Sequence, residues 1–160
     1  MSDGKVLAAR QDGAYVLRLV GDVRLNLCVT IEDYVESMLD DPAFCSVWVD
    51  LCDAEGIDST TLGQLAKLAL AVDERFGFRP AIFCCDAGIN RLLSSMGLDR
   101  LFEIHENTCS GLGCDEVLPM VPGTEEHVRQ RVLEAHRVLM DVSEENRARF
   151  KDLVASLESC

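Results

Sequence analysis

The sequence is poor in positive charge: 15 lysines and arginines stand against 28 aspartates and glutamates, a net charge of −13 over 160 residues. Binding to a nucleic-acid backbone requires basic side chains that displace counterions, so this charge disfavours a nucleic-acid partner. Docking on an anionic membrane surface is disfavoured for the same reason. The expected partner is therefore a protein with a basic surface.

Long apolar runs are also missing. None approaches the roughly 20 residues that a membrane-spanning helix requires. The first residues, MSDGKVLAARQDGAYVL, lack the apolar stretch and small-residue cleavage site of a signal peptide. We therefore expect a cytoplasmic protein without a membrane partner. Because 48% of the residues are hydrophobic, we expect a folded core rather than disorder.

Common catalytic and nucleotide-binding motifs are absent as well. The sequence has no P-loop and no Gly-x-Gly-x-x-Gly loop, and no serine lies in a Gly-x-Ser-x-Gly setting. His105, His127 and His136 have neither metal-binding nor catalytic spacing, and no cysteine has an evident histidine base. We expect no enzymatic activity, cofactor or metal. His136 lies on the apolar face of a predicted helix and is expected to pack there.

A Cys-x-x-Cys pair is missing too, although the chain has eight cysteines. Most of them lie in apolar runs, where cysteine behaves as a small hydrophobic residue. Cys109 and Cys114 form the one close pair in a loop, shortly after His105. A thiol- or zinc-dependent protein is therefore an alternative hypothesis, and it would use Cys84, Cys85, Cys109 and Cys114.

What is present is an alternation of strand and helix patterns up to about residue 106. Short apolar or alternating runs bounded by turn residues predict strands at 5–10, 14–20, 45–51, 80–85 and 101–104. Apolar positions at helical spacing predict helices at 27–39, 61–76 and 89–96. Gly21-Asp22 is expected to end the second strand, and residues 52–58 are expected to form a connection. The order β-β-α-β-α-β-α-β implies crossover units over a mixed sheet.

The C-terminal part has a different character. We expect one domain over residues 1–106, a linker over 107–123 and a helical extension over 124–160. Thr124 and Ser143 can each cap a helix, and the two helices would form an αα-hairpin. The hairpin is expected either to pack on the domain or to form a homodimer, and a partner-specific role is a further alternative.

The segment that says most about function joins a predicted strand to a predicted helix. Val47-Trp-Val-Asp-Leu51 precedes Gly56-Ile-Asp-Ser-Thr-Thr-Leu-Gly63, so a short loop delivers one carboxylate and three hydroxyls to a helix start. The unpaired N–H groups and the dipole of a helix start favour an anion, including a phosphate. The same residues also suit plain helix capping, for example a capping box between Thr61 and Gln64.

This segment resembles the signature of STAS domains, and especially that of bacterial anti-sigma factor antagonists. Leu19-Val-Gly-Asp-Val23 is similar to an early motif of the family, and Leu93-Ser-Ser-Met-Gly-Leu-Asp-Arg-Leu-Phe102 is similar to a late one. The resemblance covers roughly residues 5–106. It implies an α/β STAS fold, a mixed β-sheet with helices packed mainly on one face, here followed by the C-terminal helical hairpin.

The resemblance also implies a function. In that family the serine directly after the aspartate is the regulatory phosphorylation site, which by position is Ser59 beside Asp58. The unphosphorylated protein binds an anti-sigma factor, often a serine kinase of the histidine-kinase-like ATPase fold, and a sigma factor is released. The kinase then phosphorylates the serine and the complex dissociates, until a PP2C-type phosphatase restores the binder. The implied role is transcription regulation by partner switching.

One position departs from the family pattern, which usually has glycine where this chain has Thr61. Its extra hydroxyl and bulk leave Thr60 as an alternative acceptor, and they leave a STAS scaffold or adaptor that is never phosphorylated as an alternative function. The residues expected to bind a partner are Asp22, Arg24, Asp58, Ser59, Thr60, Thr61, Leu62 and Gln64. A phosphate would add about −1.5 to −2 charges beside Asp58, and repulsion at an interface would then oppose binding.

Overall fold

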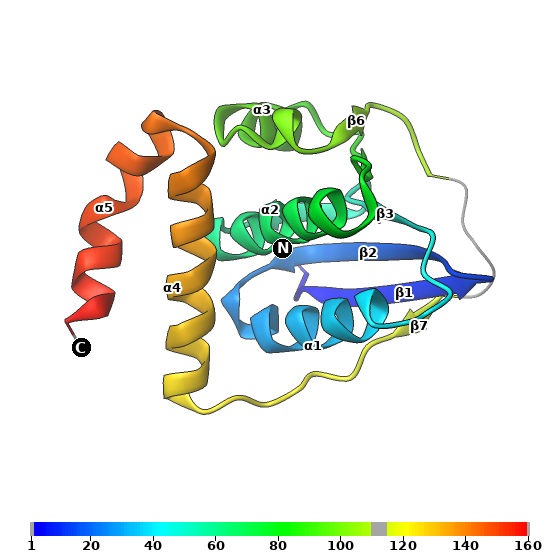
Figure 1. The fold of residues 1–160 in the computed structure, drawn as a ribbon, viewed down its shortest axis with the longest axis horizontal. Helices are drawn as coiled ribbons and strands as arrows, with labels where there is room; N and C mark the ends of the chain where they lie inside the picture. Colours follow the sequence, from blue (N-terminus) through cyan, green and yellow to red (C-terminus); the bar gives the residue numbers. More distant parts are fainter. Residues whose placement is uncertain (1, 110–114, 160) are drawn as a thin grey trace.

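A computed structural model describes residues 2–109 and 115–159 of the chain. Its strands form one mixed sheet in the order β6-β5-β3-β2-β1-β7, with β4 paired to β2 off this path (Figure 1). β1 pairs antiparallel with β2 and β7, whereas the pairs β2–β3, β3–β5 and β5–β6 are parallel. The strands are β1 Lys5–Gln11, β2 Ala14–Val23, β3 Ser46–Asp50, β4 Ala54–Ile57, β5 Ala81–Phe83, β6 Glu103–His105 and β7 Glu116–Val117.

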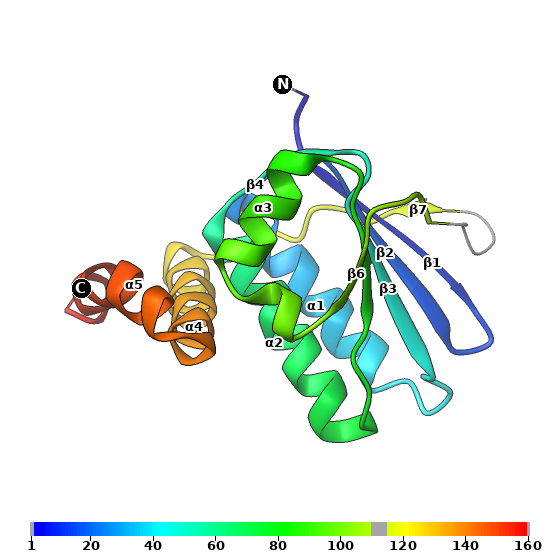
Figure 2. The same ribbon diagram turned by 90° about the horizontal axis from the view of Figure 1, so that it is seen from above.

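Three helices cover one face of this sheet, and Figure 2 shows that none of the described helices lies on the opposite face. The helices are α1 Cys28–Leu39, α2 Ser59–Phe76, α3 Ala87–Ser95, α4 Glu125–Val142 and α5 Glu144–Glu158, and α1 to α3 are those on the sheet. This arrangement confirms the predicted fold class. None of the described helices has the length and apolar character that crossing a membrane requires.

The core lies between the sheet and these helices. Val47 and Val49 of the central strand β3 are buried together with the apolar stripe of α2, which includes Leu65 and Val72. Alternate strand residues face the same side of a sheet, and helical residues three or four apart share a face, so both patterns meet in one layer. The spacing of apolar residues thus explains how α2, and with it Ser59, is held on the sheet.

Two sequence predictions about the strands are wrong. β2 does not end at Gly21-Asp22 but continues to Val23, because Gly21 adopts a left-handed φ of 78° at a bulge where the pairing with β4 shifts register. Residues 52–58 are not merely a connection, since they contain β4. β4 lies parallel to the end of β2 and brings the loop before Ser59 beside Asp22 and Val23.

The predicted linker contains the short edge strand β7, which pairs with β1. After β7, the Leu118 N–H donates to the Val6 carbonyl (2.9 Å) and the Val121 N–H donates to Thr30 Oγ1 (2.8 Å). Residues 118–124, which we call the strap, run from the end of β7 to the start of α4.

The predicted αα-hairpin is present, with Thr124 capping α4 and Ser143 capping α5 through their side-chain oxygens. In Figure 1, α4 lies across the starts of α1 and α2, and α5 packs on its outer side. Leu139 of α4 and Phe150 of α5 are buried in the main core. The hairpin therefore packs on the domain of its own chain.

Candidate functional site

The start of α2 is organised by Asp58. Its carboxylate oxygen Oδ1 accepts hydrogen bonds from both the backbone N–H and the hydroxyl of Thr61, each at 2.9 Å. Asp58 is therefore the N-cap and the helix begins at Ser59. The capping box suggested for Thr61 and Gln64 does not form, because the Gln64 side-chain amide instead donates to the Cys28 carbonyl of α1 at 2.7 Å.

The Ser59 hydroxyl is held by a residue from the hairpin. Ser59 Oγ lies 2.7 Å from His136 Nε2, and His136 Nδ1 lies 2.7 Å from the Val132 carbonyl oxygen. A carbonyl only accepts, so Nδ1 carries a proton and donates it to Val132. In the neutral imidazole Nε2 then accepts, and Ser59 donates its hydroxyl hydrogen to His136.

The His136 side chain is almost completely buried. It is 2% exposed, and its ring packs edge-on against Phe150 of α5 at 5.0 Å between ring centroids. The sequence prediction that His136 packs within the apolar face of its helix is confirmed. The bond to Ser59, 77 positions away, was missed because nothing in the local spacing indicates it.

The helices α2 and α4 approach closely one turn after Ser59. A Cβ placed on Gly63 would lie only 2.6 Å from the carbonyl carbon and 2.7 Å from the Cβ of Ala135. A glycine in a helix interior is unfavourable on its own by about 1 kcal/mol relative to alanine. Here the absent side chain allows backbone contact between the two helices, and this contact brings His136 to Ser59.

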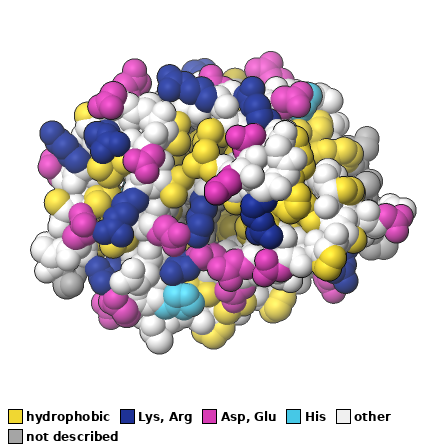
Figure 3. Space-filling model, viewed as in Figure 1, with side chains coloured by type: hydrophobic (Ala, Val, Ile, Leu, Met, Phe, Trp, Pro, Cys, Tyr) yellow, Lys and Arg dark blue, Asp and Glu magenta, His cyan; other side chains and the backbone are white. Residues whose placement is uncertain are grey.

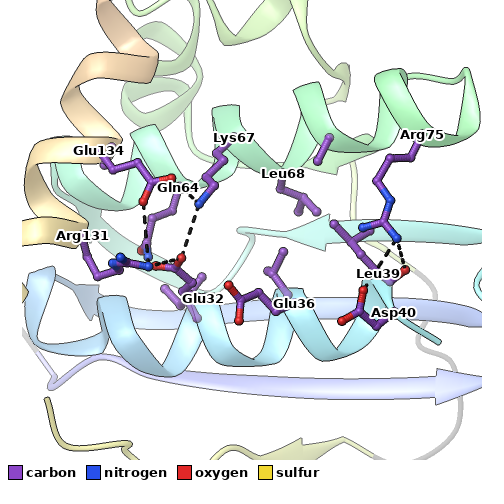
Figure 4. A pocket seen from close by; sticks show the side chains of 14 residues that line it. Glu32, Glu36, Leu39, Asp40, Gln64, Lys67, Leu68, Arg75, Arg131 and Glu134 are labelled. Atoms are coloured by element: carbon purple, nitrogen blue, oxygen red, sulfur yellow. Dashed lines mark hydrogen bonds and ion pairs between the residues drawn. The ribbon is translucent and has the colours of Figure 1, made fainter. Parts of the chain in front are cut away.

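A cluster of charged side chains joins α1, α2 and α4, as Figure 4 shows. Glu32 of α1 pairs with Arg131 of α4 and with Lys67 of α2 (3.3 Å), and Lys67 also reaches Glu134 at 2.6 Å. The cluster borders a groove of about 370 Å³ between α1, α2 and α4. In Figure 3 this hollow is surrounded by side chains of both charges. These pairs attach α4 to the domain at a second point.

The Glu32→Gln change is expected to lower the free energy of unfolding by about 1–2 kcal/mol, because it leaves the half-buried Arg131 guanidinium poorly compensated. Urea denaturation measures this loss. Glu158→Gln is the matched control, since Glu158 pairs with Arg137 on the exposed side of the hairpin (2.9 Å) and its removal should change the stability by less than about 0.5 kcal/mol. Equal effects of the two variants would show that the cluster does not attach α4.

The other side of the Ser59 turn is open. The Asp58 N–H donates to the Val23 carbonyl at 3.2 Å, so the turn lies directly beside the end of β2. There Arg24 Nε pairs with Asp22 at 2.9 Å, and this carboxylate raises the pKa of the Arg24 guanidinium. Leu25, which the sequence did not single out, is 45% exposed at the same end. The surface beside the Ser59 turn thus offers charged and apolar side chains together, which a protein partner could contact.

The structure divides the eight residues predicted to bind a partner into two groups. Asp22, Arg24, Asp58 and Ser59 are exposed or half-buried at the open side. In contrast, Thr60, Thr61 and Leu62 are buried, and Gln64 is half-buried beneath α4. In this arrangement the buried Thr60, Thr61 and Leu62 are not available to a partner.

The thiol alternative is not supported by a ligand cluster. Among residues 2–109 and 115–159, no group of three or more His, Cys, Asp or Glu side chains is placed to hold a metal. Cys84 is buried and Cys85 exposed, Cys109 is half-buried, and Cys114 lies outside the described residues. A different pair, Cys52 and Cys85, is brought together, with 2.6 Å between the sulfur atoms.

Comparison with known proteins agrees with this architecture. A family model of the STAS domain matches residues 5–110, which is more than half of the chain. The matched region covers most of the sheet, the helices α1 to α3 and the Asp58-Ser59 turn, whereas the hairpin lies outside it. No curated protein matches the chain. On the strength of the domain match, the chain belongs to the STAS domain family.

Proposed function

We propose that this chain is an anti-sigma factor antagonist that switches partners through phosphorylation of Ser59. It would act in the bacterial cytoplasm, without enzymatic activity of its own, and would regulate transcription. The observation that carries the proposal is the place of Ser59 in a STAS domain. It is the first residue of α2, directly after the capping Asp58, and it is half-buried beside the exposed Arg24 and Leu25.

In this proposal the unphosphorylated form binds an anti-sigma factor that is a serine kinase of the histidine-kinase-like ATPase fold. A phosphate on Ser59 adds about −1.5 to −2 charges next to Asp58 and close to Asp22. Like charges at an interface cost several kcal/mol when they are close, so binding is lost. A PP2C-type phosphatase returns the protein to its binding form.

The hairpin adds one requirement to this cycle. The phosphoryl group replaces the hydroxyl hydrogen that Ser59 donates to His136, so phosphorylation removes that hydrogen bond. Thr61 and Leu62 are buried, so neither is available for partner contacts in this arrangement. The hairpin therefore competes with partners for the start of α2.

The test is intact-protein and peptide mass spectrometry on protein taken from its native cells. We expect one phosphate, mapped to Ser59 and lost in Ser59→Ala, whereas Ser94→Ala removes an exposed serine of α3 and should leave the phosphate in place. Buried Thr60 is not expected to carry it. A chain that stays unmodified under every growth condition, or is modified only in the hairpin, contradicts the switch.

A second candidate is a STAS scaffold that is never phosphorylated. The hydrogen bond between Ser59 and buried His136 favours it, because this bond gives Ser59 a structural role. Incubation with the co-purifying kinase and ATP separates the two candidates: the scaffold binds its partner and takes up no phosphate. A homodimer through the C-terminal helices is part of either proposal, with Leu153 exposed on α5.

A further inference from the structure

Two cysteines lie in matching positions at one end of the sheet. β3 and β5 are neighbouring parallel strands, and their register pairs Asp50 with Phe83. The ladder continues one residue further, where the Leu51 N–H donates to the Phe83 carbonyl at 2.8 Å. Cys52 and Cys85 each lie two residues beyond this pair, just after β3 and β5 end, and their thiols meet there.

This register gives the geometry that a disulfide needs. Adjacent strands are about 4.8 Å apart, and disulfides join Cα atoms roughly 4.4–6.8 Å apart. The sulfur atoms of Cys52 and Cys85 are 2.6 Å from each other. Because the sulfur atoms already lie this close, a bond between them requires only a small movement.

The pair is also accessible, unlike two other thiols of the chain. Cys85 is exposed and Cys52 is half-buried, whereas Cys28 and Cys84 are buried. Cys45 is exposed as well, but it lies before the opposite end of β3, where its thiol contacts the Asp12 carbonyl at 3.8 Å. Cys45 is therefore a natural control: an exposed thiol directly before the same strand that does not contact another cysteine in the described part of the chain.

We propose that Cys52 and Cys85 are a redox modification site that forms a reversible disulfide on reaction with a low-molecular-weight disulfide. The Cys85 thiolate attacks one sulfur of the oxidant, the other sulfur leaves as a thiolate, and a mixed disulfide remains on Cys85. Cys52 then loses its proton and attacks the Cys85 sulfur, and the second thiolate leaves. Two protein thiols and one small disulfide thus become one protein disulfide and two small thiols.

The surroundings assign the order of the two steps. Burial raises the pKa of the Cys52 thiol, and the neighbouring Cys85 and Asp50 raise it further. Cys52 therefore stays protonated while the exposed Cys85 reacts first. Its proximity then makes Cys52 the resolving thiol, because an intramolecular attack has a high effective concentration.

The cross-link would fix the first residue of the segment that leads through β4 to Ser59. It does not involve α4 or the contact between Ser59 and His136. The inference is thus independent of the proposed function, and each can fail without the other.

The experiment equilibrates the full chain in reduced and oxidised glutathione at increasing ratios, blocks free thiols by alkylation and maps the peptides by mass spectrometry. We expect a peptide pair linked through Cys52 and Cys85, a loss of two hydrogen atoms from the intact mass, and reversal by dithiothreitol. The thermal midpoint should rise by several degrees, because a bond between residues 33 positions apart restricts the unfolded chain.

Cys85→Ser should abolish the linked pair, and Cys45→Ser should preserve it. Glutathione that remains bound to Cys85 as a mixed disulfide would overturn the proposal, because it would show that Cys52 cannot reach it. A bond from either cysteine to Cys109 or Cys114 would overturn it too. So would thiols that stay reduced at the highest glutathione disulfide ratio.

Discussion

The Gly63→Ala change is expected to push α4 away from α2 and to lower the free energy of unfolding by about 3 kcal/mol, at the upper end for overpacking. The new Cβ would lie 2.6 Å from the Ala135 carbonyl carbon, and backbone cannot turn aside as a flexible side chain can. Alanine is the better helix former by about 1 kcal/mol, so a net loss would come from the contact alone. Urea denaturation measures the loss, and hydrogen exchange of the α4 amides locates it.

Gly88→Ala is the matched control. Gly88 is exposed near the start of α3, and its Cβ would meet only the end of the Asp86 carboxylate at 3.3 Å. This variant should be neutral or slightly stabilising. If Gly63→Ala behaves in the same way, α4 does not pack closely on α2 in solution. Under the proposed function, Gly63→Ala should also increase the phosphorylated fraction of Ser59, because the hydroxyl is released.

The His136→Ala change is expected to have a similarly large effect, a loss of about 3 kcal/mol, typical of truncating a large buried side chain. It removes the ring that packs on Phe150 and leaves the Ser59 hydroxyl without its acceptor. Denaturation again gives the free energy. Phosphopeptide mass spectrometry of the same variant tests whether Ser59 becomes a better phosphate acceptor.

A second substitution separates packing from hydrogen bonding. His136→Phe keeps a ring against Phe150 but cannot accept the Ser59 hydrogen, so it should cost only about 1–2 kcal/mol and still increase phosphorylation. His127→Ala, at an exposed position of the same helix, should change neither quantity. Unchanged phosphorylation in both His136 variants would show that the bond does not restrain Ser59.

Local patterns predicted the parts of the fold that local physics determines. The apolar spacing of the helices and the caps Thr124 and Ser143 follow from neighbouring residues. β4 and β7 could not be found in this way, since their pairing with β2 and β1 depends on contacts made by distant segments. At Gly21 the breaking signal was real, but its physical outcome is a bulge rather than an end of the strand.

In the candidate site too, some features follow from neighbouring residues and others depend on distant segments. The Asp58-Ser59 turn was predicted because strand, loop and helix start are contiguous in the sequence. Its contact with His136 depends on how a helix from a different part of the chain crosses α2, which no local pattern determines. One signal was available: Gly63 lies inside an amphipathic helix, one turn after its start, where glycine is unfavourable and often marks a close approach. That signal indicates a neighbouring helix but does not identify it.

Under the proposed function, the strap between β7 and α4 determines how strongly the hairpin competes with a partner for the start of α2. Its last hydrogen bond, from Val121 to Thr30, is followed by only residues 122–124 before α4 begins. A hairpin that has left α2 is therefore retained at a local concentration on the order of millimolar. If the closed form is favoured a hundredfold, the apparent Kd of a partner for α2 rises by about the same factor. Under the proposed function, lengthening residues 122–124 would therefore tighten partner binding without changing a residue of the binding surface.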